Sequence, residues 1–119
     1  MTSLEKAKLM AKVLDSKKAY DIQLLEIGKL SSLGDYFLLA TGSNTSQVNA
    51  MAQEVEDAMT KQGEEPRRVE GYQSSQWILL DYYDVMVHIF LEDTRKFYNL
   101  ERLWCDAPKV DLSDVITAE

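Results

Sequence analysis

The sequence predicts a single α/β domain (α+β under a strict class definition), in which helices flank a mixed β-sheet of about five strands. A length of 119 residues allows one hydrophobic core, and the apolar fraction of 45% indicates that most of the chain folds. Apolar residues recur with a helical period in three segments and form continuous or alternating runs in five others. Their order along the chain is helix, strand, strand, helix, three strands, helix.

Residues 3–17 are expected to form the first helix, because their apolar side chains recur every three or four residues and lysines occupy the opposite side. Thr2 or Ser3 can cap the start of this helix through a side-chain oxygen. Residues 21–27 are expected to form the first strand.

A nearly continuous apolar run at 36–41 is typical of a strand that is covered on both faces. A second helix follows, with Asn44 as its N-cap and Gln47 at the third helical position. Apolar residues keep a helical spacing until Gly63, where this helix is expected to end.

The second half of the chain begins with a short segment between Pro66 and Gly71, which is expected to be an edge strand. The strongest strand signals lie at 77–81 and 84–90, which are predicted to form a hairpin. The connection between them runs through Tyr82 and Tyr83, although tyrosine does not favour the positive φ of a primed hairpin turn.

A last helix is predicted near 95–106, and Pro108 ends it. The domain is therefore expected to span 1–108. Residues 109–119 are predicted to be a flexible acidic tail.

The charge of the chain limits its partners. The chain has 13 basic and 20 acidic residues, a formal net charge of −7, and its basic residues are scattered. Broad binding to RNA or to an anionic membrane is therefore disfavoured, whereas a basic protein partner is compatible. The absence of an apolar run of spanning length and of a secretory signal, together with a lone cysteine, Cys105, predicts a cytoplasmic protein.

The sequence offers little catalytic chemistry. Cys105 has only His88 as a histidine partner, and a lone cysteine is more often a small buried apolar residue. One histidine and one cysteine do not supply a usual metal-ligand set. Asp81 and Asp84, with Gly42-Ser43 before a helix, invite comparison with magnesium-dependent nucleotidyltransferases, but a spacing of three across a turn does not place both carboxylates on one face. We expect no enzyme activity, no cofactor and no metal.

Aromatic residues offer a stronger functional signal, since five of them lie between residues 77 and 104: Trp77, Tyr82, Tyr83, Tyr98 and Trp104. A small core can absorb each of these residues singly. Together they are typical of a binding surface, because Trp and Tyr concentrate at interface hot spots.

Several blocks of the sequence resemble the ribosomal silencing factor family, also called the Iojap family. The resemblance extends from about Asp21 to Trp104. The matching residues are 35–43, 46–48 and Ala50; 70–71; Trp77, Leu79, Asp81, 84–85 and 87–90; and Arg95, Tyr98, 100–101 and 103–104. The chain departs from the family pattern at Tyr83, where the family often has glycine.

The resemblance implies a fold similar to that of nucleotidyltransferases, without their activity. It implies binding to the large ribosomal subunit through the intersubunit-face protein conventionally numbered fourteen, with limited direct RNA contact. Joining of the small subunit is then blocked sterically, and translation is repressed.

Carried over by matching position, the partner-binding residues are Trp77, Asp81, His88, Arg95, Tyr98, Leu100 and Trp104. Their implied roles are apolar anchors from the last helix and the hairpin, and charge-assisted hydrogen bonds from Arg95 and Asp81. His88 either supports this face or ties the sheet together. Three alternatives stay open: an assembly factor for the large subunit, a nucleotidyltransferase-like enzyme, and a homodimer through the same aromatic surface.

Overall fold

A computed structural model describes residues 1–116 of the chain. Six strands form one sheet in the order β3-β4-β5-β2-β1-β6. The strands are β1 (Tyr20–Glu26), β2 (Tyr36–Gly42), β3 (Arg68–Glu70), β4 (Trp77–Asp81), β5 (Val85–Leu91) and β6 (Lys109–Val110). The β2–β5 pair is parallel and the other neighbours are antiparallel, so the predicted mixed sheet is confirmed.

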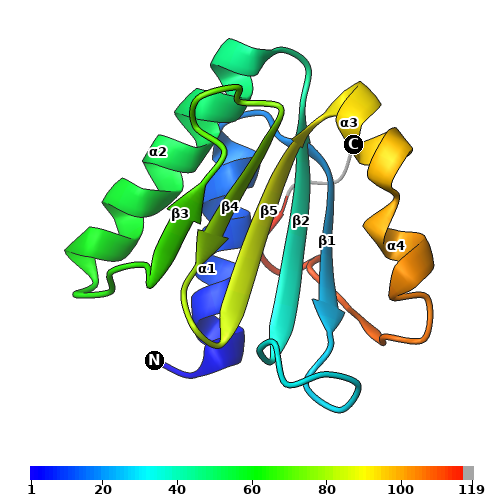
Figure 1. The fold of residues 1–119 in the computed structure, drawn as a ribbon. Helices are drawn as coiled ribbons and strands as arrows, with labels where there is room; N and C mark the ends of the chain where they lie inside the picture. The colour runs from blue at the N-terminus through cyan, green and yellow to red at the C-terminus, as the bar shows by residue number, and fades with distance from the viewer. Residues whose placement is uncertain (117–119) are drawn as a thin grey trace.

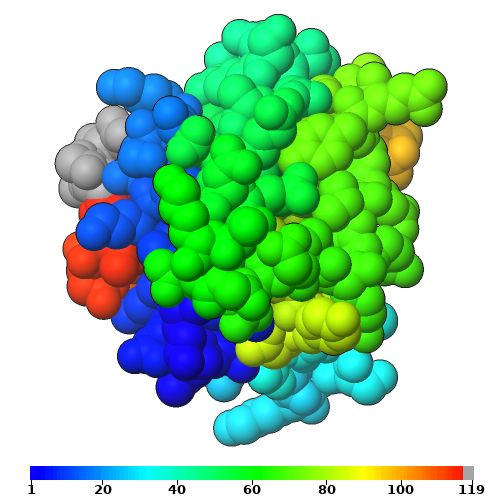
Figure 2. All heavy atoms as spheres, turned by 90° about the vertical axis from the view of Figure 1, so that its left-hand side faces the viewer, coloured from blue at the N-terminus to red at the C-terminus, as the bar shows by residue number. Residues whose placement is uncertain are grey.

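Two long helices lie on one side of the sheet and two short ones on the other (Figure 1). The long helices are α1 (Ser3–Ser16) and α2 (Thr45–Lys61), and the short ones are α3 (Glu92–Tyr98) and α4 (Leu100–Leu103). In Figure 2 α2 faces the viewer and α1 lies to its left. None of these helices is both long and apolar enough to cross a bilayer.

The starts of α1 and α2 agree with the sequence-based expectation. Thr2 accepts a hydrogen bond from the Glu5 N–H, and the Glu5 carboxylate accepts one from the Thr2 N–H, which completes a capping box. Asn44 accepts a hydrogen bond of 2.8 Å from the Gln47 N–H. Each cap satisfies a backbone donor that the helix itself leaves unpaired.

Side-chain alternation along β5 divides the core into two clusters. Val85, Val87 and Ile89 belong to the cluster under α1 and α2, whereas Met86 and Phe90 belong to the cluster on the side of α3 and α4. This is the division that an alternating strand produces.

Two predictions about the chain after β5 differ from the structure. The single helix expected near 95–106 begins at Glu92 and is broken at Asn99, which has a left-handed backbone with φ 47°. The expected tail contributes β6, which pairs with Leu24 and Leu25 of β1, so the sheet gains a sixth strand. The flexibility of 109–119 stays a prediction, and residues 117–119 lie outside the described part of the chain.

The turn between β4 and β5 adopts the conformation that the sequence disfavours. Tyr83 has φ 73°, and the Asp84 N–H donates to the Tyr82 carbonyl over 2.9 Å. A bond from residue i+2 back to residue i across a positive φ is that of a γ-turn. Tyrosine thus occupies a strained backbone position where the family pattern often has glycine.

Candidate functional site

The sheet face next to α3 and α4 is only partly covered, and large apolar side chains line it. We call it the aromatic face and define it by Trp77, Leu79, Tyr98, Leu100 and Trp104. Tyr98 is 51% exposed, and the other four side chains are half-buried. This face combines aromatic area with partial exposure, as interface hot spots do.

The strands bring part of this face together through their register. Trp77 pairs with Phe90 and Leu79 pairs with His88 across the β4–β5 ladder, so all four side chains point to the same side. The turn before Trp77 depends on Gly71, which has φ +98°. A Cβ at Gly71 would lie 2.0 Å from the Trp77 carbonyl oxygen, so only glycine fits there.

The short helices supply the rest of the face. Tyr98 of α3 lies against Trp77, with ring centroids 4.8 Å apart. Leu100 and Trp104 are four residues apart and therefore lie on one side of α4 and its C-cap. The Trp104 ring meets the buried Phe37 ring edge-on, with centroids 5.2 Å apart.

His88 supports the aromatic face from below. It is 5% exposed, and its Nδ1 accepts a hydrogen bond of 3.1 Å from the Trp77 indole N–H. The accepted bond assigns the proton of the neutral ring to Nε2, which has no hydrogen-bond partner among the described residues. Burial lowers the pKa of His88 to about 4, so the ring is uncharged at neutral pH. His88 therefore holds the Trp77 indole through a side-chain bond.

Arg95 is placed beneath the short helices and not on their outer surface. It is 5% exposed, and its Nη1 donates to the Asp21 carbonyl and to the Thr41 hydroxyl, both at 2.6 Å. Its Nε donates to the Glu101 carboxylate over 3.1 Å. One guanidinium thus joins α3, the neighbouring strands β1 and β2, and α4.

Asp81 lies at the far end of β4 from Trp77 and is 1% exposed. Its carboxylate accepts hydrogen bonds from the Tyr83 N–H at 2.9 Å and from Arg67 at 3.0 and 3.1 Å. In this structure Asp81 therefore fixes the β4–β5 turn.

Asp84 faces a different set of groups. It accepts hydrogen bonds from Lys6 at 2.7 Å and from Ser3 at 2.5 Å, which join the turn to α1. Burial alone would raise the pKa of Asp84, but these bonds hold it below its ordinary value. Asp81 and Asp84 thus have separate partners, and within residues 1–116 no group of three or more acidic, histidine or cysteine side chains is arranged to hold a metal ion.

Of the seven residues chosen from the sequence, the structure brings five together: Trp77, His88, Tyr98, Leu100 and Trp104. Arg95 lies beneath this group, and Asp81 lies at the other end of the hairpin. Cys105 is exposed while His88 is buried, so the pair that a thiol mechanism would need is not assembled.

Three apolar residues of this region are not among the seven chosen from the sequence. Leu79 alternates with Trp77 along β4, and that alternation was a usable signal. Phe97 is 80% exposed and Leu103 is 74% exposed on the outer side of α3 and α4. Neither residue belongs to the apolar stripe that packs against the core. The break at Asn99 changes which residues share a side, so a single helix over 95–106 did not indicate their exposure.

These features define a small mixed α/β protein that displays a partly exposed aromatic face. A family model described as "Ribosomal silencing factor during starvation" matches residues 1–119. The chain is 41% identical over 117 residues to the ribosomal silencing factor of Halalkalibacterium halodurans, covering 98% of this chain and 100% of that protein. The chain therefore belongs to the ribosomal silencing factor family.

Two further relatives show how far the similarity extends in structure and in sequence. The crystal structure of protein CV0518 from Chromobacterium violaceum superposes with a TM-score of 0.86 at 34% identity, covering 95% of this chain and 93% of that one. A mouse protein named "Mitochondrial assembly of ribosomal large subunit protein 1" is 24% identical over 99 residues, and the chain covers 43% of its length.

Proposed function

We propose that this protein docks through its aromatic face onto the large ribosomal subunit in the cytoplasm and sterically blocks joining of the small subunit. The protein partner is the one conventionally numbered fourteen on the intersubunit face. The aromatic face is the observation that carries this proposal, because it offers partly exposed Trp, Tyr and Leu side chains on one side of a rigid sheet. The net charge of −7 favours binding to a protein over binding to RNA.

The seven residues divide into two roles in this proposal. Trp77, Tyr98, Leu100 and Trp104 contact the partner. His88 and Arg95 hold that surface in shape, the first through Trp77 and the second through α4. Asp81 holds the adjoining turn through Arg67 and Tyr83.

The experiment is co-sedimentation of the purified protein with large subunits, small subunits and joined ribosomes, with subunit joining followed in parallel. Selective binding to large subunits with reduced joining is the expected result. Tyr98→Ala and Trp104→Ala are each expected to weaken binding by about 2 kcal/mol, the size of a hot-spot loss.

Tyr83→Ala is the matched control, because Tyr83 is 58% exposed but lies at the β4–β5 turn, outside the aromatic face. Equal loss of binding for Tyr83→Ala and Tyr98→Ala would remove the aromatic face from the proposal. Absence of binding to every ribosomal particle would overturn the proposed function itself.

We also propose that the protein acts without catalysis. Asp81 and Asp84 are each engaged by cations of the chain itself, Arg67 and Lys6. A nucleotidyltransferase mechanism would instead need both carboxylates free for magnesium. Magnesium-dependent nucleotide binding that disappears in Asp81→Asn would contradict this proposal.

A second candidate function is assembly of the large subunit through the same face. The name of the mouse relative favours this candidate. The two functions differ in the particle that is bound: silencing requires mature large subunits, whereas assembly requires precursors. Protein and RNA analysis of particles captured from growing and starved cells separates them.

A further inference from the structure

We infer that residues 107–116 form a clasp that fixes the position of α4, and that Leu112 is the positioning residue of this clasp. The clasp passes from the aromatic face, around the β1 edge of the sheet, to the side of α1. The inference about the position of α4 stands on the structure alone. Its consequence for docking rests on the proposed function.

The α4 helix depends on its surroundings for its position. It has four residues, lacks a side-chain cap among the described residues and follows Asn99 in the left-handed conformation. A helix of this length is not stable by itself in water. The half-buried Leu100 and Trp104 side chains therefore need external support to keep the geometry of the aromatic face.

The first half of the clasp gives that support from the aromatic side. Ala107 is 7% exposed and belongs to the same core cluster as Phe37, and its N–H donates to the Trp104 carbonyl over 2.9 Å. The Pro108 carbonyl then accepts a hydrogen bond of 2.9 Å from Glu26. The chain after Trp104 is thus tied directly to β1.

The second half of the clasp is anchored on the other side of the sheet. Leu112 is 6% exposed and belongs to the core cluster under α1, where Val115 and Ile116 pack beside it. The Asp111 carboxylate accepts hydrogen bonds from the backbone N–H and the hydroxyl of Ser113, which turns the chain toward α1. Leu112 is therefore the one side chain of 107–116 that is buried in the α1 cluster.

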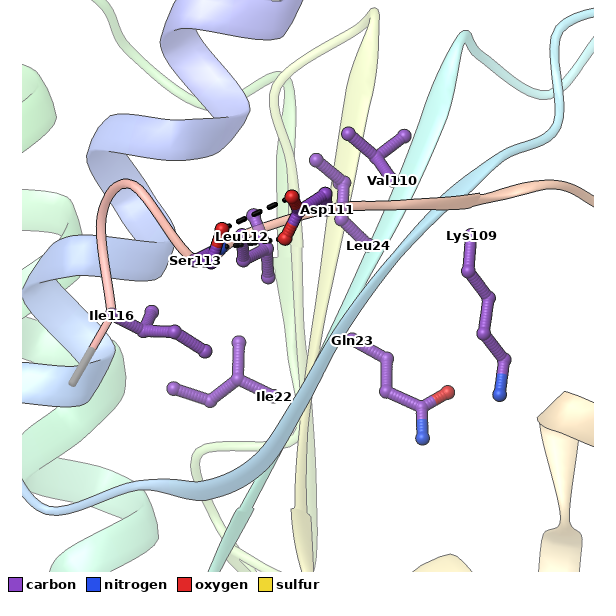
Figure 3. A pocket seen from close by; sticks show the side chains of 9 residues that line it. All are labelled: Ile22, Gln23, Leu24, Lys109, Val110, Asp111, Leu112, Ser113 and Ile116. Carbon is purple, nitrogen blue, oxygen red and sulfur yellow. Dashed lines mark hydrogen bonds between the residues drawn. The ribbon is translucent and has the colours of Figure 1, made fainter. Parts of the chain in front are cut away.

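The clasp is only loosely packed against the sheet. β6 pairs with β1 at two residues only, and a pocket of about 470 Å³ lies between the clasp and the β1 edge. Figure 3 shows Ile22, Leu112 and Ile116 around the part of this pocket that faces α1, while Lys109 points to the other side. Because the pocket leaves apolar surface without packing partners, a small loss at Leu112 is expected to release the clasp.

The test labels the protein with 5-fluorotryptophan and follows the two ¹⁹F resonances, one from Trp77 and one from Trp104. Leu112→Ala is expected to shift or broaden the Trp104 resonance and to leave that of Trp77 in place. If about a tenth of the molecules keep α4 in position, binding to large subunits weakens about tenfold.

Val55→Ala is the control variant, since Val55 is fully buried on α2, in the same core cluster as Leu112 but outside the clasp. It lowers stability without changing a residue of the clasp, so the Trp104 resonance and the binding constant are expected to stay unchanged. Leu112→Met is expected to restore both signals, because it refills the same volume. If Leu112→Ala does not fold, Leu112→Val gives a graded version of the same change.

The outcomes separate the clasp from the proposed function. An unchanged Trp104 resonance in folded Leu112→Ala overturns the clasp, whatever the protein binds. A changed resonance with unchanged binding overturns its role in docking. A changed resonance in a protein whose wild type binds no ribosomal particle supports the clasp and overturns the proposed function.

Discussion

The two faces of the sheet differ in how they are covered and in what holds them together. Under α1 and α2 the core consists mainly of apolar side chains with little or no exposure, such as Leu38, Met51 and Ile89, and the covering helices are 14 and 17 residues long. On the other face the helices have seven and four residues, and the arginine beneath them donates hydrogen bonds to Asp21, Thr41 and Glu101. The first face stabilises the fold, and the second displays a surface whose shape is set by hydrogen bonds.

This difference teaches that a residue of the aromatic region can match the family pattern and still be buried. His88 and Arg95 are both 5% exposed, so a large partner cannot reach most of either side chain. Their neighbours Trp77 and Tyr98 are accessible. His88, which matches a family motif, is thus buried itself but contacts an accessible aromatic side chain.

The largest effect is expected for Arg95→Ala, which should act on both stability and docking. Its removal leaves the buried Thr41 hydroxyl and the Glu101 carboxylate without their partner, at a cost of about 3–5 kcal/mol in the free energy of unfolding. Urea denaturation measures the first effect and co-sedimentation the second.

Arg95→Lys is the control for charge alone, since an ammonium group cannot bridge the Asp21 carbonyl, Thr41 and Glu101 at the same time. Full recovery in Arg95→Lys would mean that positive charge, and not the guanidinium geometry, holds α3 and α4.

Leu38→Ala is expected to cost nearly as much stability but to spare the surface. Leu38 is fully buried under α1 and α2, and a leucine truncation in such a core costs about 2–5 kcal/mol. The affinity of the folded fraction for large subunits should stay that of the wild type. A weaker affinity at full folding would show that the two faces are coupled through β2.

The sequence predicts the first face better than the second, for a physical reason. Helical spacing and the alternation along β5 are local signals, and both clusters of the core follow from them. The position of Arg95 depends instead on acceptors 54 and 74 residues away in the chain. The two-residue β6 has no periodicity of its own, and only its pairing with Leu24 and Leu25 defines it.

The third prediction concerns the pH dependence of the aromatic face. Because burial lowers the pKa of His88 from 6.5 to about 4, the unfolded state binds the proton first as the pH falls. The His88 contribution to stability is therefore complete above pH 6.5 and is lost progressively toward pH 4.

This loss amounts to roughly 2 kcal/mol between pH 6.5 and 4.5, because the unfolded state binds about one extra proton over that range. In His88→Gln, whose amide oxygen can still accept the Trp77 N–H, the slope of unfolding free energy against pH should fall by about one proton. Urea titrations at several pH values measure it, and an unchanged slope would show that another group titrates there.

The smallest effect is expected at the turn that joins the two hairpin strands. Tyr83 has φ 73°, and a left-handed backbone costs a non-glycine residue about 1–2 kcal/mol. Its ring lies 4.9 Å from the Arg67 guanidinium carbon, and an exposed contact of this kind returns about 0.5–1 kcal/mol. Tyr83→Gly should therefore raise stability by less than about 1 kcal/mol, since relief of strain exceeds loss of the contact.

Tyr83→Ala keeps the strain but loses the contact and should lower stability, so thermal unfolding of the two variants side by side gives opposite signs. Equal signs would mean that the ring contact, and not the backbone, decides the stability of this turn.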